Sequence, residues 1–113
     1  MIQNKKVLGT LGLAQRAGDV ASGEFMTEKA IREGKACLVI VAEDASDNTR
    51  KKFRNACYYY KVPYAVFGDR EMLGKALGKE FRASLAVMDS GFAASIGKNL
   101  ELEVTEYGKN ENI

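Results

Sequence analysis

The side chains that most often carry out chemistry are scarce in this chain of 113 residues. It contains no histidine and only two cysteines, Cys37 and Cys57. The absence of imidazole removes the usual general base at neutral pH and most kinds of zinc site. The sequence also lacks the GxSxG, CxxC, HExxH and phosphate-loop signatures. We therefore expect a protein that is not an enzyme and that binds neither a cofactor nor a metal.

Two adjacent acids, Glu43 and Asp44, directly follow the most apolar run of the chain. Acidic residues of α/β enzymes often occupy this position. Without a histidine or a second group of carboxylates, the two acids are more simply explained as a loop and helix-cap pair. The cysteines have a similar interpretation: Cys37 begins the apolar run and Cys57 lies on an apolar helix stripe, as expected of reduced core thiols in a cytosolic protein.

The segment from Ser22 to Lys29 combines a glycine turn with basic residues. Gly23 lets the chain turn into a helix, and the free N–H groups at the start of that helix suit an anion. Lys29 and Arg32 follow within the next turns, on the outer face, where they are suited to contact phosphate. A charged helix face is more often simply solvated, so this pattern alone leaves both interpretations open.

A second segment, Gly78 to Ser84, carries Lys79, Phe81 and Arg82. An exposed aromatic ring in such a loop can stack on a base or pack into a widened RNA groove. The alternative is that Phe81 points into the core while the charged side chains are solvated. Together the two segments make RNA a candidate ligand.

The charges are unevenly distributed along the chain, which has 17 Lys and Arg residues against 15 Asp and Glu residues. Residues 101–113 hold four of the acids and one of the bases, so residues 1–100 carry 16 bases and 11 acids, a net charge of +5. A modest basic excess fits an RNA partner. The chain has no apolar run long enough for a signal peptide or a membrane span, so we expect a cytoplasmic protein.

Hydrophobic periodicity predicts five helices that alternate with short strands. The strands are expected over residues 19–22, 36–42, 64–67 and 83–88. Capping residues are expected at the starts of three helices, namely Asn4 for the first, Asp69 for the fourth and either Asp89 or Ser90 for the fifth. Residues 101–113 show no clear core pattern and are expected to form an acidic, mobile tail.

The run 36–42 is apolar at every position, so it is expected in the middle of a sheet that is covered on both faces. In the following helix, Phe53, Ala56, Cys57 and Tyr60 are expected to face this sheet. The alternation of helices and strands predicts an α/β protein, a three-layer α/β/α sandwich with a central four-stranded mixed sheet. We expect residues 1–100 to form this single domain.

Two separated motifs resemble a known family. The run KAIREGKACLVIVAED at 29–44 is followed by Val62-Pro63-Tyr64 and then by LGKALG at 73–78. In this order and spacing they resemble the ribosomal L-seven-Ae / L-thirty-e superfamily, and in particular its bacterial YlxQ-like branch. The resemblance covers residues 4–100. It implies an α/β/α sandwich that binds kink-turns, which are sharply bent RNA elements with sheared G·A pairs.

In that superfamily the RNA surface joins the start of the second helix to the loop before the last strand. The archaeal helix start reads G-x-N-E-x-x-K, and alignment on Gly23 and Lys29 places Phe25 and Met26 where the Asn and Glu read guanine edges. The resemblance thus implies retained phosphate attraction but weaker and less selective binding. The implied RNA-binding residues are Ser22, Gly23, Glu24, Phe25, Met26, Lys29, Arg32, Lys79, Phe81, Arg82, Ala83 and Ser84.

The resemblance implies a non-catalytic RNA-binding protein whose partners are a structured ribosomal or regulatory RNA and the ribosome. Two alternatives remain open. One is a protein–protein interaction module on the same fold, since Phe25 and Met26 would form a small apolar surface. The other is an accessory relative of the substrate-recognition domain of some RNA methyltransferases.

Overall fold

The structure, a computed structural model, describes the backbone of residues 2–100 and the side chains from residue 5. The acidic tail expected at 101–113 lies outside the described residues. The described helices are α1 (Ile2–Arg16), α2 (Glu24–Arg32), α3 (Asp47–Tyr60), α4 (Arg70–Ala76) and α5 (Ser90–Asn99). The described strands are β1 (Val20–Ser22), β2 (Leu38–Val41), β3 (Tyr64–Val66) and β4 (Ser84–Val87).

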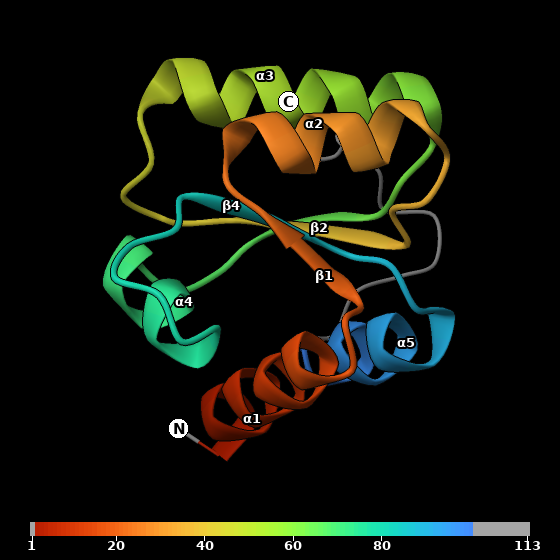
Figure 1. The fold of residues 1–113 in the computed structure, drawn as a ribbon. Helices are drawn as coiled ribbons and strands as arrows, with labels where there is room; N and C mark the ends of the chain where they lie inside the picture. The colour runs from red at the N-terminus through yellow and green to blue at the C-terminus, as the bar shows by residue number, and fades with distance from the viewer. Residues whose placement is uncertain (1, 101–113) are drawn as a thin grey trace.

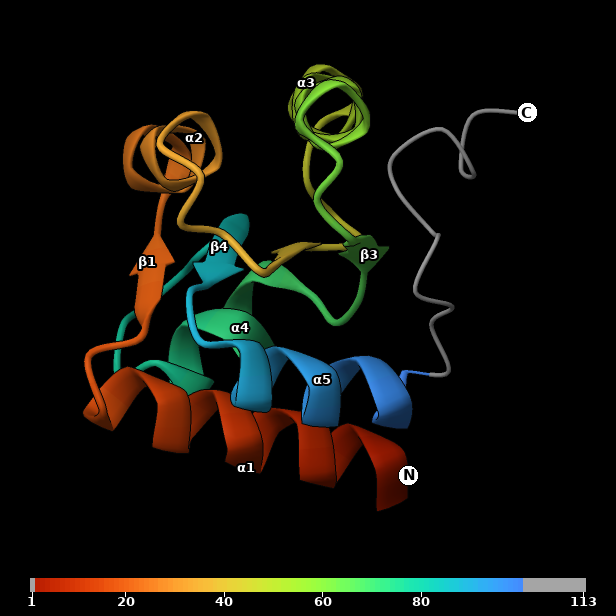
Figure 2. The same cartoon turned by 90° about the vertical axis from the view of Figure 1, so that its right-hand side faces the viewer.

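The four strands form one mixed sheet in the order β1-β4-β2-β3. Strand β4 runs antiparallel to both of its neighbours, whereas β2 and β3 are parallel. Helices α2 and α3 cover one face of this sheet, and α1, α4 and α5 cover the other (Figures 1 and 2). The predicted three-layer α/β/α sandwich with a mixed four-stranded sheet is confirmed.

The core lies on both faces of the two central strands, because every residue of β2 and β4 is buried. Ile31 of α2 and Phe53 of α3 pack into the core from one helical layer. Leu11, Leu73 and Ile96 pack into it from the other layer. A strand that is covered in this way needs apolar residues on both faces, which explains the unbroken apolar run of β2.

Side chains cap the starts of α3, α4 and α5, whereas α2 begins at Gly23 without a side-chain cap. Asp69 accepts a hydrogen bond from the N–H of Met72 at 2.8 Å, and Asp89 accepts one from the N–H of Phe92 at 2.9 Å, so both expected caps are confirmed. The prediction that Asn4 caps the first helix is wrong. Helix α1 begins at Ile2, which places Asn4 inside the first turn.

The prediction that Tyr60 faces the sheet is also wrong, since 43% of its surface is exposed. Lys61 adopts the left-handed conformation with φ of 60° and ends α3 directly after Tyr60. The chain then turns back, and the N–H of Val62 donates to the carbonyl of Cys57 at 2.9 Å. Val62 is buried and takes the inward position that the helical period had assigned to Tyr60.

No helix among the described residues is both long and apolar enough to cross a membrane.

Candidate nucleic-acid interface

The two segments singled out in the sequence meet at one edge of the sheet. Strands β1, β2 and β3 run in one direction and β4 runs in the other. The start of α2, which follows β1, therefore lies beside the start of β4 and the loop that precedes it (Figure 1, left). We call this the α2–β4 edge, formed by residues 22–29 and 78–84.

Gly23 joins the two segments through its backbone. Its N–H donates to the carbonyl of Ser84 at 2.9 Å, and its own carbonyl accepts from the N–H of Thr27 at 2.9 Å. Its φ of 91° lies in the left-handed region, where side chains are rarely tolerated. No atom lies within 4 Å of a Cβ built at this position, so the backbone conformation rather than crowding requires glycine.

Arg82 fixes the loop to the end of β1. Its Nε donates to the hydroxyl of Ser22 at 2.9 Å, and its Nη1 donates to the carbonyl of Phe81 at 2.8 Å. Its backbone N–H donates to the carbonyl of Arg70 at the start of α4, at 3.0 Å. The guanidinium is therefore held in place at the α2–β4 edge, and it orients the peptide unit that carries Phe81.

Gly74 lets the same loop lie directly on α4. A Cβ at this position would be 2.4 Å from the carbonyl oxygen of Glu80 and 2.8 Å from the nitrogen of Phe81. The N–H of Lys79 donates to the carbonyl of Gly74 at 2.8 Å. Sequence reasoning used Gly74 only as part of the family motif. Glycine in the middle of a short helix costs stability, so its presence at position 74 indicates that another backbone segment packs closely against the helix there.

Three apolar side chains of the α2–β4 edge are exposed, namely Phe25 at 68%, Met26 at 45% and Phe81 at 56%. The alternative that Phe81 points into the core is therefore excluded. Aromatic rings that keep most of their surface in water do not contribute to the core, so they are available to a ligand.

The ion-pair partners of the charged residues on α2 could not be predicted from the sequence. Glu24 accepts a hydrogen bond from Lys52 of α3 at 2.9 Å, and Lys52 is also 3.2 Å from Glu28. The hydrogen bond that Lys52 donates to Glu24 raises the pKa of Lys52; desolvation opposes this rise, and the hydrogen bond donated to Glu28 adds to it. Glu24 thus bridges α2 to α3. Lys29 is half-buried near the middle of α2.

Arg32 lies in the last turn of α2, about 12 Å along the helix axis from Glu24. Its guanidinium is 4.0 Å from the carboxylate of Glu28. The structure therefore separates Arg32 from the α2–β4 edge.

Ser84 is buried, and its hydroxyl donates to that of buried Thr27 at 3.3 Å. The Ser84 hydroxyl therefore lies beneath α2 and is not exposed at the α2–β4 edge. Lys79 is exposed and Ala83 is half-buried. The structure brings together the following predicted residues at the α2–β4 edge: Ser22, Gly23, Glu24, Phe25, Met26, Lys29, Lys79, Phe81, Arg82 and Ala83.

The acidic pair has a structural explanation. Asp44 accepts hydrogen bonds from the N–H of Arg70 at 2.9 Å and from its Nε at 3.3 Å. Desolvation opposes ionisation of Asp44, but these interactions with Arg70 outweigh it and lower the pKa of the carboxyl group. The pair ties the loop after β2 to α4. Residues 2–100 contain no group of three or more His, Cys, Asp or Glu residues placed to hold a metal ion.

A sequence model of the Ribosomal protein L7Ae/L30e/S12e/Gadd45 family matches residues 5–96. The chain belongs to this family. RNA-binding protein YlxQ of Bacillus subtilis is 53% identical over 83 residues, which cover 74% of this chain and 83% of that protein. RNA-binding protein YlxQ of Enterococcus faecium is 39% identical over 98 residues, covering 86% and 93%. Within the L7Ae/L30e family, the chain therefore belongs to the bacterial YlxQ-like branch.

One further relative and two solved structures extend the comparison. Large ribosomal subunit protein eL30 of Methanoregula boonei is 37% identical over 83 residues, covering 73% of this chain and 84% of that protein. A solved structure of a Bacillus halodurans protein of unknown function has a TM-score of 0.83 and 40% identity, covering 85% and 97% of the two chains. The Giardia lamblia 15.5kD RNA binding protein has a TM-score of 0.76 at 24% identity, covering 91% and 92%, and shows the same fold.

Proposed function

We propose that this chain is a non-catalytic RNA-binding protein that recognises kink-turn-like structured RNA, in ribosomal or regulatory RNA, through the α2–β4 edge. Two relatives that are named RNA-binding proteins, at 53% and 39% identity, support the ligand class. The domain over residues 1–100 is the RNA-binding unit in this proposal.

The observation that carries the proposal is that two exposed aromatic rings, those of Phe25 and Phe81, lie on segments that a hydrogen bond joins. Phe25 follows Gly23 on α2, and Phe81 precedes Arg82 in the loop. The hydrogen bond from Arg82 to Ser22 joins the two segments. The backbone segments that carry the two rings are thereby joined before any ligand arrives, so little backbone ordering entropy is lost on binding.

Each group at the edge has a role in this proposal. The backbone N–H groups at the start of α2 and the ammonium of Lys29 attract phosphate. Phe25 and Phe81 stack on unpaired bases, and Met26 adds apolar contact. Neither Phe25 nor Met26 offers the hydrogen bonds of an Asn–Glu pair, and each lost bidentate base contact costs about 1–3 kcal/mol of discrimination. We therefore expect a preference for kink-turns that is real but modest.

The test compares two RNAs and two variants by electrophoretic titration. The RNAs are a kink-turn and a matched straight duplex in which Watson–Crick pairs replace the sheared G·A pairs. We expect the wild-type protein to prefer the kink-turn. Phe25→Asp removes a stacking ring and adds a negative charge beside phosphate, so we expect kink-turn affinity to fall by at least about tenfold.

Tyr59→Asp is the matched control, because it also replaces an exposed aromatic residue with aspartate but lies on α3. We expect it to change kink-turn affinity by less than about threefold. Equal wild-type affinity for the two RNAs would contradict kink-turn recognition. Absence of RNA binding at low salt, together with loss of a protein partner in Phe25→Asp, would instead identify a protein-interaction module.

A further inference from the structure

Helices α1 and α5 form the most one-sidedly charged part of the described protein. They lie side by side in the helical layer opposite α2 and α3 (Figures 1 and 2). Their sequences contain four basic residues and no acidic residue. The four bases are Lys5, Lys6, Arg16 and Lys98. Together they carry a charge of +4, and the net charge of residues 1–100 is +5. The basic excess of the chain is therefore concentrated here.

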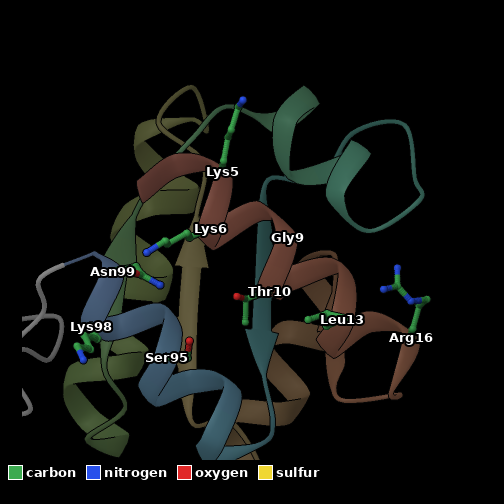
Figure 3. Close-up of a pocket in the computed structure, with 9 residues that line it drawn as sticks. All are labelled: Lys5, Lys6, Gly9, Thr10, Leu13, Arg16, Ser95, Lys98 and Asn99. Carbon is green, nitrogen blue, oxygen red and sulfur yellow. The ribbon is translucent and has the colours of Figure 1, made fainter. Parts of the chain in front are cut away.

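The four bases line one groove between the two helices, with a volume of about 620 Å³. Figure 3 shows Lys6 extending toward Asn99, with Lys5 near one end of the α1 segment and Arg16 near the other. From Lys5 to Arg16 the helix rises by about 16 Å, which is long enough to follow several phosphates of one strand. No atom lies within 4 Å of a Cβ built at Gly9, so the wall of the groove is open at this point.

Three cations of the α2–α3 layer differ from the groove cations because they have carboxylate partners. In that layer Lys52, Arg32 and Arg50 each form an ion pair with a nearby carboxylate. Within the part of the chain that the structure describes, no groove cation has such a partner. Cations that line one groove and have no anionic partner among the described residues repel one another, and a polyanion removes this repulsion.

The lining of the groove points to a phosphate backbone rather than to another ligand. Thr10, Ser95 and Asn99 supply neutral groups that can donate hydrogen bonds to phosphate oxygens. None of the described residues that line the groove is aromatic, so none offers a ring on which a base could stack. Among these described residues Leu13 is the only large apolar side chain, whereas a protein interface or a membrane-inserted helix presents several apolar anchors.

We propose that the α1–α5 groove is a second RNA-binding surface, which holds the phosphate backbone of duplex RNA without regard to sequence. Its walls lie across the sheet from α2, and none of its lining residues belongs to the α2–β4 edge. A protein with both surfaces can hold two RNA segments at once. Binding of duplex RNA in the groove does not depend on kink-turn recognition.

The experiment uses the full chain and a mixed-sequence RNA duplex of about 16 base pairs that contains no kink-turn. Titrations over a range of salt concentrations compare the wild-type protein with the triple variant K5Q/K6Q/K98Q. We expect the groove variant to bind the duplex at least about tenfold more weakly, with a slope of log affinity against log salt that is smaller by about 2 to 3.

The control variant K35Q/K51Q/K61N removes the same number of charges from exposed lysines of the α2–α3 layer. Asn is used at position 61 because it tolerates the left-handed conformation there. We expect its affinity for the duplex to change by less than about threefold. Equal losses in the two variants would overturn the proposal, because they would report net charge rather than the groove. Unchanged melting temperatures confirm that both variants are folded.

Two further arms separate the possible ligands and the two surfaces. Vesicles of phosphatidylcholine and phosphatidylserine test a lipid ligand: vesicle binding lost in K5Q/K6Q/K98Q, with duplex binding unchanged, would overturn the RNA proposal. Phe25→Asp is expected to leave duplex affinity unchanged while it weakens kink-turn binding. Failure of kink-turn recognition and failure of the groove proposal are thereby distinguished.

Discussion

At the scale of single residues, Cys57 shows how burial controls ionisation. Its side chain is fully buried in α3, and this burial raises the pKa of the thiol to about 12 from an ordinary value of 9.0. The unfolded chain therefore ionises first as the pH rises. Folded-state stability supplied by the neutral thiol is complete below pH 9.0 and is lost progressively up to about pH 12.

We therefore predict that the free energy of unfolding falls by about 1.4 kcal/mol between pH 8 and pH 10 through Cys57. Urea titrations at the two pH values measure this change. Cys57→Ala provides the reference, since its smaller pH dependence isolates the contribution of the thiol. Lys52 adds little in this interval, because its raised pKa keeps it charged until above its ordinary 10.5. An identical fall in the alanine variant would contradict the prediction.

Single residues also mark the limit of reading function from sequence. The helical period placed Lys29 and Arg32 on the outer face of α2, and the structure shows Thr27, Ala30 and Ile31 on its buried face. The partner of Glu24 did not follow from the sequence, because Lys52 is 28 residues away in the chain and meets it only once α2 and α3 pack together.

At the scale of elements, α4 acts as the support for the loop that carries Phe81. We predict that Gly74→Ala displaces residues 80–81, since the added methyl group would meet backbone atoms that cannot rotate away. Such overpacking costs about 1–3 kcal/mol of stability. The displaced loop also moves Phe81, so kink-turn affinity is expected to fall at temperatures where the variant is fully folded.

Gly97→Ala is the control for this change, because Gly97 lies within α5 and a Cβ there meets no atom within 4 Å. We expect it to be neutral or to stabilise the protein by about 0.5–1 kcal/mol, since alanine favours helix. Thermal melting and RNA titration of both variants test the pair. Unchanged stability and RNA affinity in Gly74→Ala would show that the loop is not held against α4 in solution.

At the scale of the whole molecule, the sheet is protected unevenly. Strands β2 and β4 are flanked on both sides, whereas β1 and β3 are edge strands. We predict that hydrogen-bonded amides of β1 exchange at least about tenfold faster than those of β2, by local opening of the edge. Hydrogen exchange followed by NMR measures this difference. Equal rates throughout the sheet would show that it opens only as one unit.

The layers and the sheet were predictable because alternating helical and extended apolar patterns leave few ways to bury both faces of β2. Local exceptions were not predictable. Tyr60 is displaced from the core by a left-handed turn at Lys61, and Ser84 is buried because β4 passes beneath α2. The α1–α5 groove could not be predicted from the sequence for another reason. Lys5 and Lys98 are far apart in the chain, and only the fold brings them to the same groove.

The position of β4 has a consequence for synthesis of the chain. Strand β1 is made early, but its partner in the sheet is β4, which lies between β1 and β2 and begins only at Ser84. Until the ribosome has released that segment, β1 has no strand to join it to β2 and β3. The domain is therefore completed in a single late step, when the last strand enters the gap left for it in the sheet.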